Sequence, residues 1–535
     1  MTARVVGVFP MEAHARRRRL FAALEAAFPL RFEGRDQADT DGLDGAVFVG
    51  AAPPAKPPAC PWLSFEHDRV ASPARASVHI GTDPLIDARL RGRTLTEGLA
   101  GAARPLRPAD SGRVLATTPA GPVWLASAEE PRRYLASVAP AELAADEPLR
   151  ARLRAGSFLG LLPLIHLLRE ICAERPWTQP APRACFIIDD PNLHALTYGH
   201  VDFRRLVAHA ARGGYHVAIA STPLDYGFVH RRAAALFRER SGQISLAIHG
   251  NNHERHELAR VHDEAAALAL GAQALRRSRR LEQRTGLRVS RVMCAPHEEC
   301  NQVMVRALFR LGFDGLAREL MAPVSQPAAR AGGVLADWEP AELIGGLPVL
   351  PRYGLRADGE DLVFRSYLNL PILVCLHHQD LAGGLDVLDA TAAKVNRLGP
   401  HSWMSLTDIC RSNAVWWRMG NALVVRPYAR RVALPVDRDV ERIVVETPPS
   451  EPSVELRISC GSASTSGPAG GAFDVAGPFP SLVEIEMSSV DRVGADAVPA
   501  PSPRVWPVVR RLLTESRDRL APLPRPRRLA QRLIA

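Results

Sequence analysis

Short apolar runs alternate with polar and helical stretches over the first 150 residues of the chain. The periodicity of the apolar positions predicts a helix near 12–27 and a hairpin from 113–117 to 122–126, about the turn Pro119-Ala120-Gly121. Further apolar runs of strand length lie at 5–9, 30–32, 46–49 and 62–65. Residues 1–150 are therefore predicted to form a small α/β domain. They contain no nucleotide-binding fingerprint that would assign them a role.

A second series of buried strands follows a predicted helix near 156–173 and a proline-rich break, which together occupy residues 151–182. Apolar runs without polar alternation lie at 184–188, 216–220, 244–248, 290–294, 349–350 and 372–376. Helical patterns fill several of the intervals, at 203–212, 231–240, 263–285 and 303–311. Continuously apolar strands joined by helices are typical of a parallel sheet covered on both faces, and their number suits a barrel. We therefore expect a (β/α) barrel over residues 183–412.

The pattern changes after Cys410 to strand-like stretches separated by Pro, Gly and Ser. These stretches lie at 422–426, 443–447, 454–458 and 482–487. They predict a β-rich domain over 413–498, which is followed by an Arg-rich tail over 499–535. The fold class is accordingly α/β, with a barrel between a small N-terminal α/β domain and a C-terminal β-rich domain.

Positive charge is concentrated in the tail. The formal net charge is +10, and nine Arg against Glu515 and Asp518 in the last 35 residues account for +7 of it. Lys occurs only at Lys56 and Lys394, so a G+C-rich genome explains much of the Arg excess. The functional alternative is that the tail contacts an anionic membrane or partner, through Arg510, Arg511, Arg517, Arg519, Arg525, Arg527, Arg528 and Arg532. No RNP-like aromatic motif or zinc-finger spacing is present, so nucleic acid is not expected as a partner.

Cysteine spacing and the N-terminus indicate a reduced, cytoplasmic location. The eight Cys include no CxxC pair, which argues against a disulfide framework and a structural zinc site. The first residues lack the apolar run of a secretory signal. The most apolar helix candidate, 158–168, has about 11 residues and is well short of a membrane span. Membrane association through the tail is the alternative to a purely cytoplasmic protein.

Two adjacent carboxylates, Asp189 and Asp190, follow the apolar strand at 184–188. Catalytic groups collect at the carboxyl ends of barrel strands. Because neighbouring side chains of a strand point in opposite directions, one carboxylate can bind a cation while the other works as a base. An Asp-Asp pair before Pro191 is also a common turn or helix cap.

Two histidines, His249 and His253, follow the strand at 244–248. Residues four apart meet on one face if the second begins a helix, although one such spacing can arise by chance among 17 His. With Asp190 they supply three ligands and leave a position for water, which is the composition of a catalytic metal site. One divalent ion is expected; zinc is the first candidate, and Mn, Fe, Co and Ni are the alternatives.

In this order the motifs resemble those of the polysaccharide deacetylases, the NodB-homology family of carbohydrate esterases (family 4). The resemblance spans about 230 residues and implies a distorted barrel of the NodB type. It also implies a metal-dependent hydrolase that removes an acetyl group from an N-acetylated carbohydrate. On this resemblance Asp189 is the general base, whereas Asp190, His249 and His253 are the metal ligands.

Two further motifs complete the resemblance. Residues 293–297 fall where the family has an Arg-Pro-Pro motif whose backbone N–H helps to form the oxyanion site. Residues 373–378 look like the final motif, which supplies a general acid. His377 is preferred for that role over His378 because it directly follows the apolar run, and only one of the two can face the metal. Asp337-Trp338 falls where the family has a fourth, Asp-containing motif.

Several positions depart from the family pattern. Gly250 replaces the usual Ser or Thr, Pro191 stands where Gly is common, and Cys294 stands where an Arg pairs with the base. The pKa of Asp189 would then be set by other neighbours. His297 and Glu298 are either substrate contacts or exposed loop residues. For Glu254 and His256, exposure on a helix after His253 is the favoured interpretation.

Two alternatives to a deacetylase stay open. One is a metal-dependent amidase that acts on a non-sugar C–N bond, because a fold does not determine a substrate. The other is a glycan-binding accessory protein without catalysis, which the Cys294 replacement suggests. If the chain is a deacetylase, the missing signal favours a cytoplasmic precursor, lipid-linked or nucleotide-linked, as substrate. The oligomeric state is not indicated by the sequence.

Overall fold

The computed structural model describes residues 4–522 except 37–39, 55–57, 69–73, 99, 108–111, 145–146, 148, 155, 174–177, 320–340, 356–358, 448–453, 462 and 470–471. The chain divides into two compact units. The first comprises Met1–Trp177, Pro327–Glu339 and Asp358–Leu368, and the second comprises the remainder.

The first unit contains one nine-stranded mixed sheet in the order β2-β1-β3-β4-β9-β8-β7-β5-β6. Its strands are β1 (Arg4–Phe9), β2 (Leu30–Gly34), β3 (Gly45–Val49), β4 (Trp62–His67), β5 (Ala76–Ile80), β6 (Thr94–Glu97), β7 (Arg113–Thr118), β8 (Gly121–Ala126) and β9 (Arg133–Val138). The five strands from β2 to β9 in this order are parallel, and the other pairings are antiparallel. Strands β7 and β8 form the hairpin predicted from the turn before Gly121.

Four helices accompany this sheet: α1 (Met11–Ala15), α2 (Arg18–Ala27), α3 (Leu161–Ile171) and α8 (Gly359–Tyr367). The single helix predicted near 12–27 is thus divided into two, because the backbone leaves the helical conformation at Arg17. Helix α3, predicted as part of a connecting segment, contacts β4 and β9 and buries its apolar residues, including Leu164 and Leu168. Its apolar composition therefore serves the core of this unit.

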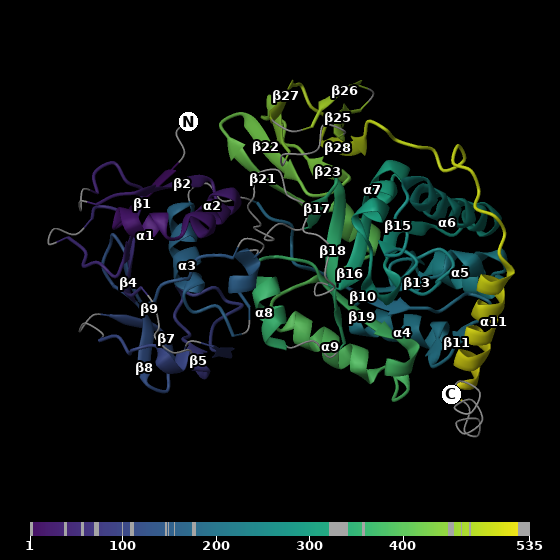
Figure 1. The fold of residues 1–535 in the computed structure, drawn as a ribbon, viewed down its shortest axis with the longest axis horizontal. Coiled ribbons are helices and arrows are strands. Elements are labelled where there is room, and N and C mark those ends of the chain that lie inside the picture. Colours follow the sequence, from purple (N-terminus) through teal and green to yellow (C-terminus); the bar gives the residue numbers. More distant parts are fainter. Residues whose placement is uncertain are drawn as a thin grey trace. The chain divides into compact units, whose positions relative to one another are not determined.

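The second unit contains a closed barrel of seven parallel strands, as the continuous apolar runs predict (Figure 1). In order around the barrel they are β10 (Arg183–Asp189), β13 (Val217–Ser221), β14 (Ile244–His249), β15 (Val289–Cys294), β16 (Gly315–Glu319), β18 (Leu347–Gly354) and β19 (Ile372–His377), which pairs again with β10. Every residue of β10 and β13 is buried, as expected for strands covered on both faces.

Short strands and helices complete the barrel. The strands are β11 (Thr197–Tyr198), β12 (Val201–Asp202), β17 (Glu342–Ile344) and β20 (Ser402–Trp403). The helices are α4 (Phe203–Gly213), α5 (Arg231–Glu239), α6 (Glu264–Thr285), α7 (Gln302–Leu311), α9 (Asp386–Asn396) and α10 (Leu406–Arg411). Side chains of Asp202, Asp263 and Asn301 accept backbone N–H groups at the starts of α4, α6 and α7, which explains where these helices begin.

Eight strands follow the barrel and form two four-stranded sheets, β21-β22-β24-β27 and β23-β28-β25-β26. Their bounds are β21 (Ala414–Met419), β22 (Ala422–Pro427), β23 (Arg431–Pro435), β24 (Arg442–Glu446), β25 (Val454–Cys460), β26 (Ala463–Pro468), β27 (Ala472–Ala476) and β28 (Leu482–Ser489). The Arg-rich tail contains a helix that its composition did not predict, α11 (Val505–Leu520), which contacts β11 at the barrel (Figure 1). Within the described part of the chain, no helix combines the length and apolar character needed to cross a membrane.

Candidate metal centre

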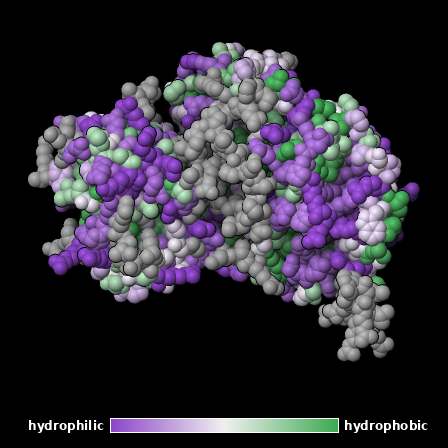
Figure 2. All heavy atoms as spheres, viewed as in Figure 1, coloured by the Kyte–Doolittle hydropathy of each residue, from purple (hydrophilic) through white to green (hydrophobic). Residues whose placement is uncertain are grey.

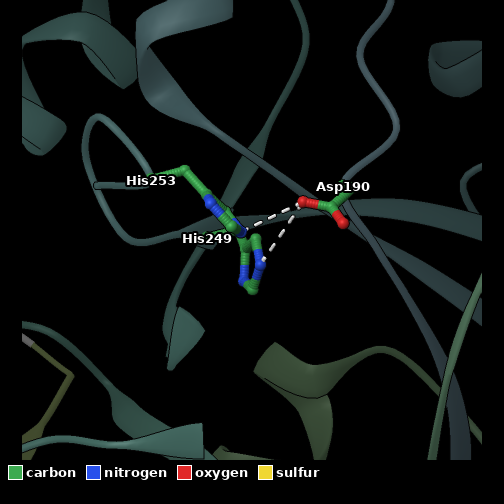
Figure 3. Close-up of side chains that lie close together, drawn as sticks. All are labelled: Asp190, His249 and His253. Atoms are coloured by element: carbon green, nitrogen blue, oxygen red, sulfur yellow. Dashed lines mark ion pairs between the residues drawn. The ribbon is translucent and has the colours of Figure 1, made fainter. Parts of the chain in front are cut away.

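Asp190, His249 and His253 come together at the carboxyl ends of β10 and β14. Asp190 follows the last residue of β10, His249 is the last residue of β14, and His253 lies in the loop after it. Asp190 Oδ1 lies 3.1 Å from His253 Nε2 and 3.8 Å from His249 Nε2 (Figure 3). The three ligand atoms all lie within 4.8 Å of one another, so one metal ion could contact all of them.

The ring of His249 is oriented toward Asp190 by a hydrogen bond on its other nitrogen. Its Nδ1 lies 3.1 Å from the carbonyl oxygen of Cys294 on β15, which accepts the Nδ1 proton. Nε2 is then the unprotonated nitrogen, and it faces Asp190. Burial and the neighbouring His253 hold the pKa of His249 well below its usual value, so the ring is neutral, as a metal ligand must be.

The surroundings of Asp190 favour its charged form, whereas those of His249 favour the neutral ring. Its burial raises its pKa, but the hydrogen bond from His253 and the charges of His253, His249 and Arg511 outweigh burial and hold the pKa well below the usual value. The same contact with Asp190 raises the pKa of His253 against the effect of burial. Asp190 is therefore an anion at neutral pH, the form that binds a cation.

His253 does not begin a helix, so that part of the prediction is wrong. Its backbone is left-handed with φ 56°, and helix α6 begins only at Glu264. The loop is held instead by the buried carboxylate of Glu257. Glu257 accepts the backbone N–H groups of Asn251 at 2.7 Å, Asn252 at 3.1 Å and His253 at 3.0 Å. Local periodicity could not reveal a loop that closes on a single carboxylate.

Gly250 departs from the family pattern for a steric reason. Its φ is +61°, and a Cβ there would collide with Oε1 of Glu257 and lie 2.7 Å from Cγ of Pro296. A Ser or Thr at this position would have to displace the carboxylate that holds the His253 loop. Gly250 thus leaves room for the Glu257 carboxylate, which in turn holds the backbone of His253.

Asp189 lies inside the barrel and is paired with Arg352 of β18. Arg352 Nη1 donates to Asp189 Oδ1 at 3.0 Å, and its Nη2 donates to the carbonyl oxygen of Ala295 at 3.0 Å. Its Nε donates to Glu298 Oε2 at 2.9 Å. Burial raises the pKa of Asp189, and the charge of Arg352 opposes that rise. The family pattern has an Arg at the position of Cys294. In this chain Arg352, on another strand, pairs with Asp189 instead.

Sequence reasoning missed Arg352, although one signal was present. An Arg that follows directly on an apolar run, here Val349-Leu350-Pro351, is costly to bury unless a carboxylate pairs with it. Glu298, for which a substrate contact or an exposed loop position was expected, pairs with Arg352 instead. His297 lies beside the candidate ligands, with its ring centroid 5.3 Å from that of His253.

His377 and His378 have different surroundings. His377 ends β19 in register with Asp189 of β10, and its side chain is exposed. His378 is buried, with Nε2 3.5 Å from Asp518 Oδ1 and its ring 5.5 Å from that of Tyr198. The register places His377 on the strand end next to Asp189, whereas His378 contacts helix α11.

Other predicted residues lie near the site in turns. Glu254 and His256 are in the turn after His253 and not on a helix, which corrects that interpretation. His256 Nδ1 lies 2.8 Å from Glu299 Oε2, and Glu254 accepts from Arg504 at 3.1 Å. Asp337-Trp338 lies outside the described residues.

Helix α11 brings a further Arg to the site, and no signal in the sequence placed it there. Arg511 donates from Nη2 to Asp225 Oδ2 at 2.5 Å and to the carbonyl oxygen of Asp190 at 3.3 Å. Arg510 donates to the carbonyl oxygen of His253. Part of the tail's charge therefore stabilises the ligand loops within the chain.

Comparisons with known proteins give structural likeness only. No protein-family model matches the chain, and a search of curated proteins finds no match. A structure described as a polysaccharide deacetylase from Mycobacterium smegmatis is 15% identical, with 44% of this chain and 91% of that chain covered and a TM-score of 0.29. A family 4 carbohydrate esterase from Streptomyces lividans is 11% identical, with 41% and 87% covered and a TM-score of 0.23. A CE4 esterase from Streptococcus mutans is 13% identical, with 42% and 87% covered and a TM-score of 0.25. At these TM-scores the likeness carries no conclusion about function.

Proposed function

We propose that this chain is a metal-dependent hydrolase that removes an acetyl group from an N-acetylated sugar or glycan precursor. The observation that carries the proposal is the convergence of Asp190, His249 and His253 next to the buried Asp189. Three ligands and an adjacent carboxylate at the mouth of a parallel barrel are the parts of a hydrolytic metal site. The order of the motifs resembles that of polysaccharide deacetylases, and this resemblance is the reason to propose an acetylated sugar as the substrate.

The residues present fit a divalent metal ion. The donor set is one carboxylate oxygen and two imidazole Nε2 atoms, and the Nδ1 of His249 is already engaged by a backbone carbonyl. That arrangement suits zinc as the first candidate. When bound, the ion supplies a Lewis acid and an activated water.

Asp189 is proposed as the general base. It is adjacent in sequence to the ligand Asp190, and Arg352 holds its carboxylate with a hydrogen bond of 3.0 Å. Arg352 is itself held by Glu298 and by the Ala295 carbonyl, so the base has a defined position. Asp189 would take a proton from the attacking water.

His377 is proposed as the general acid. Its register with Asp189 places it at the end of the neighbouring strand, where it would protonate the departing amine. The backbone N–H near Pro296-His297 is proposed to stabilise the oxyanion that develops on the acetyl carbonyl. His378 is assigned no part in the chemistry, because it is buried against Tyr198 and Asp518.

The paired Arg352 bears on the alternative of an inactive accessory protein. That alternative arose because Cys294 replaces the Arg that pairs with the base. Since Arg352 makes the pair from β18, the replacement gives no reason to expect inactivity. An amidase with a non-sugar substrate would use the same residues, and only the substrate distinguishes it.

An acetate-release assay tests the proposed function. The purified full chain, loaded with zinc, is incubated with chitooligosaccharides and with UDP-linked N-acetyl sugars, and released acetate is measured. We expect release that disappears in His249→Ala. Cleavage of non-sugar amides without any acetate release from these sugars would replace the proposed substrate class by the amidase.

A further inference from the structure

Helix α11 turns its charged side chains toward the barrel and its apolar side chains toward solvent. Its inner face includes Arg511 and Asp518, which are almost fully buried. Its outer face includes Leu512 and Leu513, whose exposed fractions are 56% and 62%. Five further apolar residues of the helix are also exposed: Val505, Trp506, Val508, Val509 and Leu520. A surface helix of a globular protein normally has the reverse orientation.

The charged face is held to the barrel by directional contacts. Arg511 Nη2 lies 2.5 Å from Asp225 Oδ2, and both side chains are buried. Tyr198 donates to Asp518 Oδ2 at 2.7 Å. His194 Nδ1 lies 2.9 Å from Glu515 Oε2 on the same helix. The helix cannot turn its apolar face inward without breaking these buried pairs, which is strongly unfavourable.

The outer face of α11 is therefore a contiguous apolar surface that needs a partner. Figure 2 shows hydrophobic colouring at the edge of the molecule where Figure 1 places α11. Isolated apolar residues on a surface are ordinary, but seven on one face of a helix mark an interaction site.

Charge indicates what this partner is. The fifteen residues that follow the helix, 521–535, contain four Arg and no acidic residue. Arg504 and Arg517 are also exposed, but each is paired with a carboxylate, Arg504 with Glu254 at 3.1 Å and Arg517 with Asp518 at 2.7 Å, so the excess charge is that of the four Arg after the helix. An apolar helix face with Arg around it matches the interface of an anionic membrane, into which the apolar side chains insert while the Arg side chains contact the headgroups. A second copy of the chain fits this surface less well, because it would place the same positive charge next to that of the first copy.

We propose that the outer face of α11 is a docking surface for an anionic lipid membrane. The inner face of the same helix contacts Asp190 and His253 through Arg511 and Arg510. Docking thus places lipid about 10 Å, one helix diameter, from the metal ligands. If the proposed function holds, the substrate this arrangement favours is an acetylated sugar carried on a lipid.

Co-sedimentation with vesicles tests the docking surface. We expect the full chain to bind vesicles of phosphatidylcholine and phosphatidylglycerol in equal amounts, but not vesicles of phosphatidylcholine alone, and to be released as salt rises. The double variant Leu512→Ser with Leu513→Ser should partition more weakly, on the order of tenfold. Val490→Ser, whose side chain is 61% exposed outside α11, is the matched control and should bind as the parent does.

The charged part of the surface has its own variant. Replacing Arg525, Arg527, Arg528 and Arg532 by Gln should weaken binding to the anionic vesicles and reduce its salt dependence, because headgroup contacts are lost. An unchanged melting temperature confirms that these variants fold. If the Leu512→Ser and Leu513→Ser double variant does not fold, Trp506→Ser provides a second apolar variant.

Two results would overturn the inference. One is a full chain that stays in the supernatant with anionic vesicles, or an α11 variant that sediments as the parent does. The other is a dimer in solution that the Leu512→Ser and Leu513→Ser variant abolishes, which would make a second copy the partner. Vesicle binding requires neither metal nor acetate release, so this inference and the proposed function can fail separately.

Discussion

Two groups of His and Asp in the barrel unit have nearly the same composition but different surroundings. Asp190, His249 and His253 bring three ligand atoms within 4.8 Å of one another, and so do His209, Asp386 and Asp389. In the first group His249 is buried and the other two are mostly buried. In the second group the side chains of Asp386 and Asp389 are 100% and 51% exposed.

The difference lies in what holds each side chain. His249 is oriented by the Cys294 carbonyl, and the His253 loop is held by Glu257. Asp386 and Asp389 stand in the first turn of α9, where acidic residues stabilise a helix without any ligand. His209 is also oriented, by Tyr215 OH at 2.8 Å, so the burial of the carboxylate is what distinguishes the first group: Asp190 is 20% exposed.

Removal of one candidate ligand from each group should give the largest difference between the two groups. We expect His249→Ala to lose bound metal and to reduce acetate release on the order of a thousandfold or more, because two ligands do not hold an activated ion. His209→Ala should keep both. Metal content is measured by elemental analysis of the purified proteins. Equal metal loss in the two variants would remove the distinction between the groups.

Replacement of the base should separate chemistry from metal binding. Asp189→Asn keeps the size of the side chain but cannot take a proton, so turnover should fall roughly a hundredfold to ten-thousandfold while metal content stays. Asp386→Asn, in the exposed group, is the control and should leave both unchanged. Retained turnover in Asp189→Asn would exclude this residue as the base.

Loss of the buried Arg should reduce both stability and turnover. Arg352→Met leaves the buried Asp189 without its partner, which costs about 3–5 kcal/mol of the free energy of unfolding. The exposed pair of Arg418 with Asp439 provides the control, and Arg418→Met should cost less than about 1 kcal/mol. Denaturant unfolding of both variants measures the difference. Similar costs would mean that the Asp189 pair contributes no more than a surface pair.

The smallest expected effect tests the support behind His253. Glu257→Gln keeps the shape but loses the charge that accepts three backbone N–H groups, so metal affinity should fall on the order of tenfold. Glu254→Gln, in the same turn but not bonded to these groups, should change affinity little. Competition with a chelator measures both. An unchanged affinity in Glu257→Gln would show that the loop needs no help from this carboxylate.

The sequence by itself predicted a parallel barrel and six of its seven strands; β16 (Gly315–Glu319) was missed. A parallel strand that is buried on both faces is continuously apolar, so these six strands are visible in their own residues, whereas β16 ends in Arg318 and Glu319 and is not. The candidate ligands were visible for a similar reason, since Asp190 and His249 stand at ends of such runs. The division of 12–27 into α1 and α2, and strands β5, β6 and β9, escaped prediction because their patterns are short and partly exposed.

Only the tertiary structure decided how the site is supported. Arg352 and Asp189 are 163 residues apart in the chain, and Arg511 and Asp225 are 286 apart. Nothing in the neighbourhood of either Arg identifies its partner, because burying a charge depends on which carboxylate the fold brings to it. The inverted orientation of α11 has the same origin: its sequence is amphipathic whichever face turns inward, and the buried pairs with Asp225 and Tyr198 select the charged one.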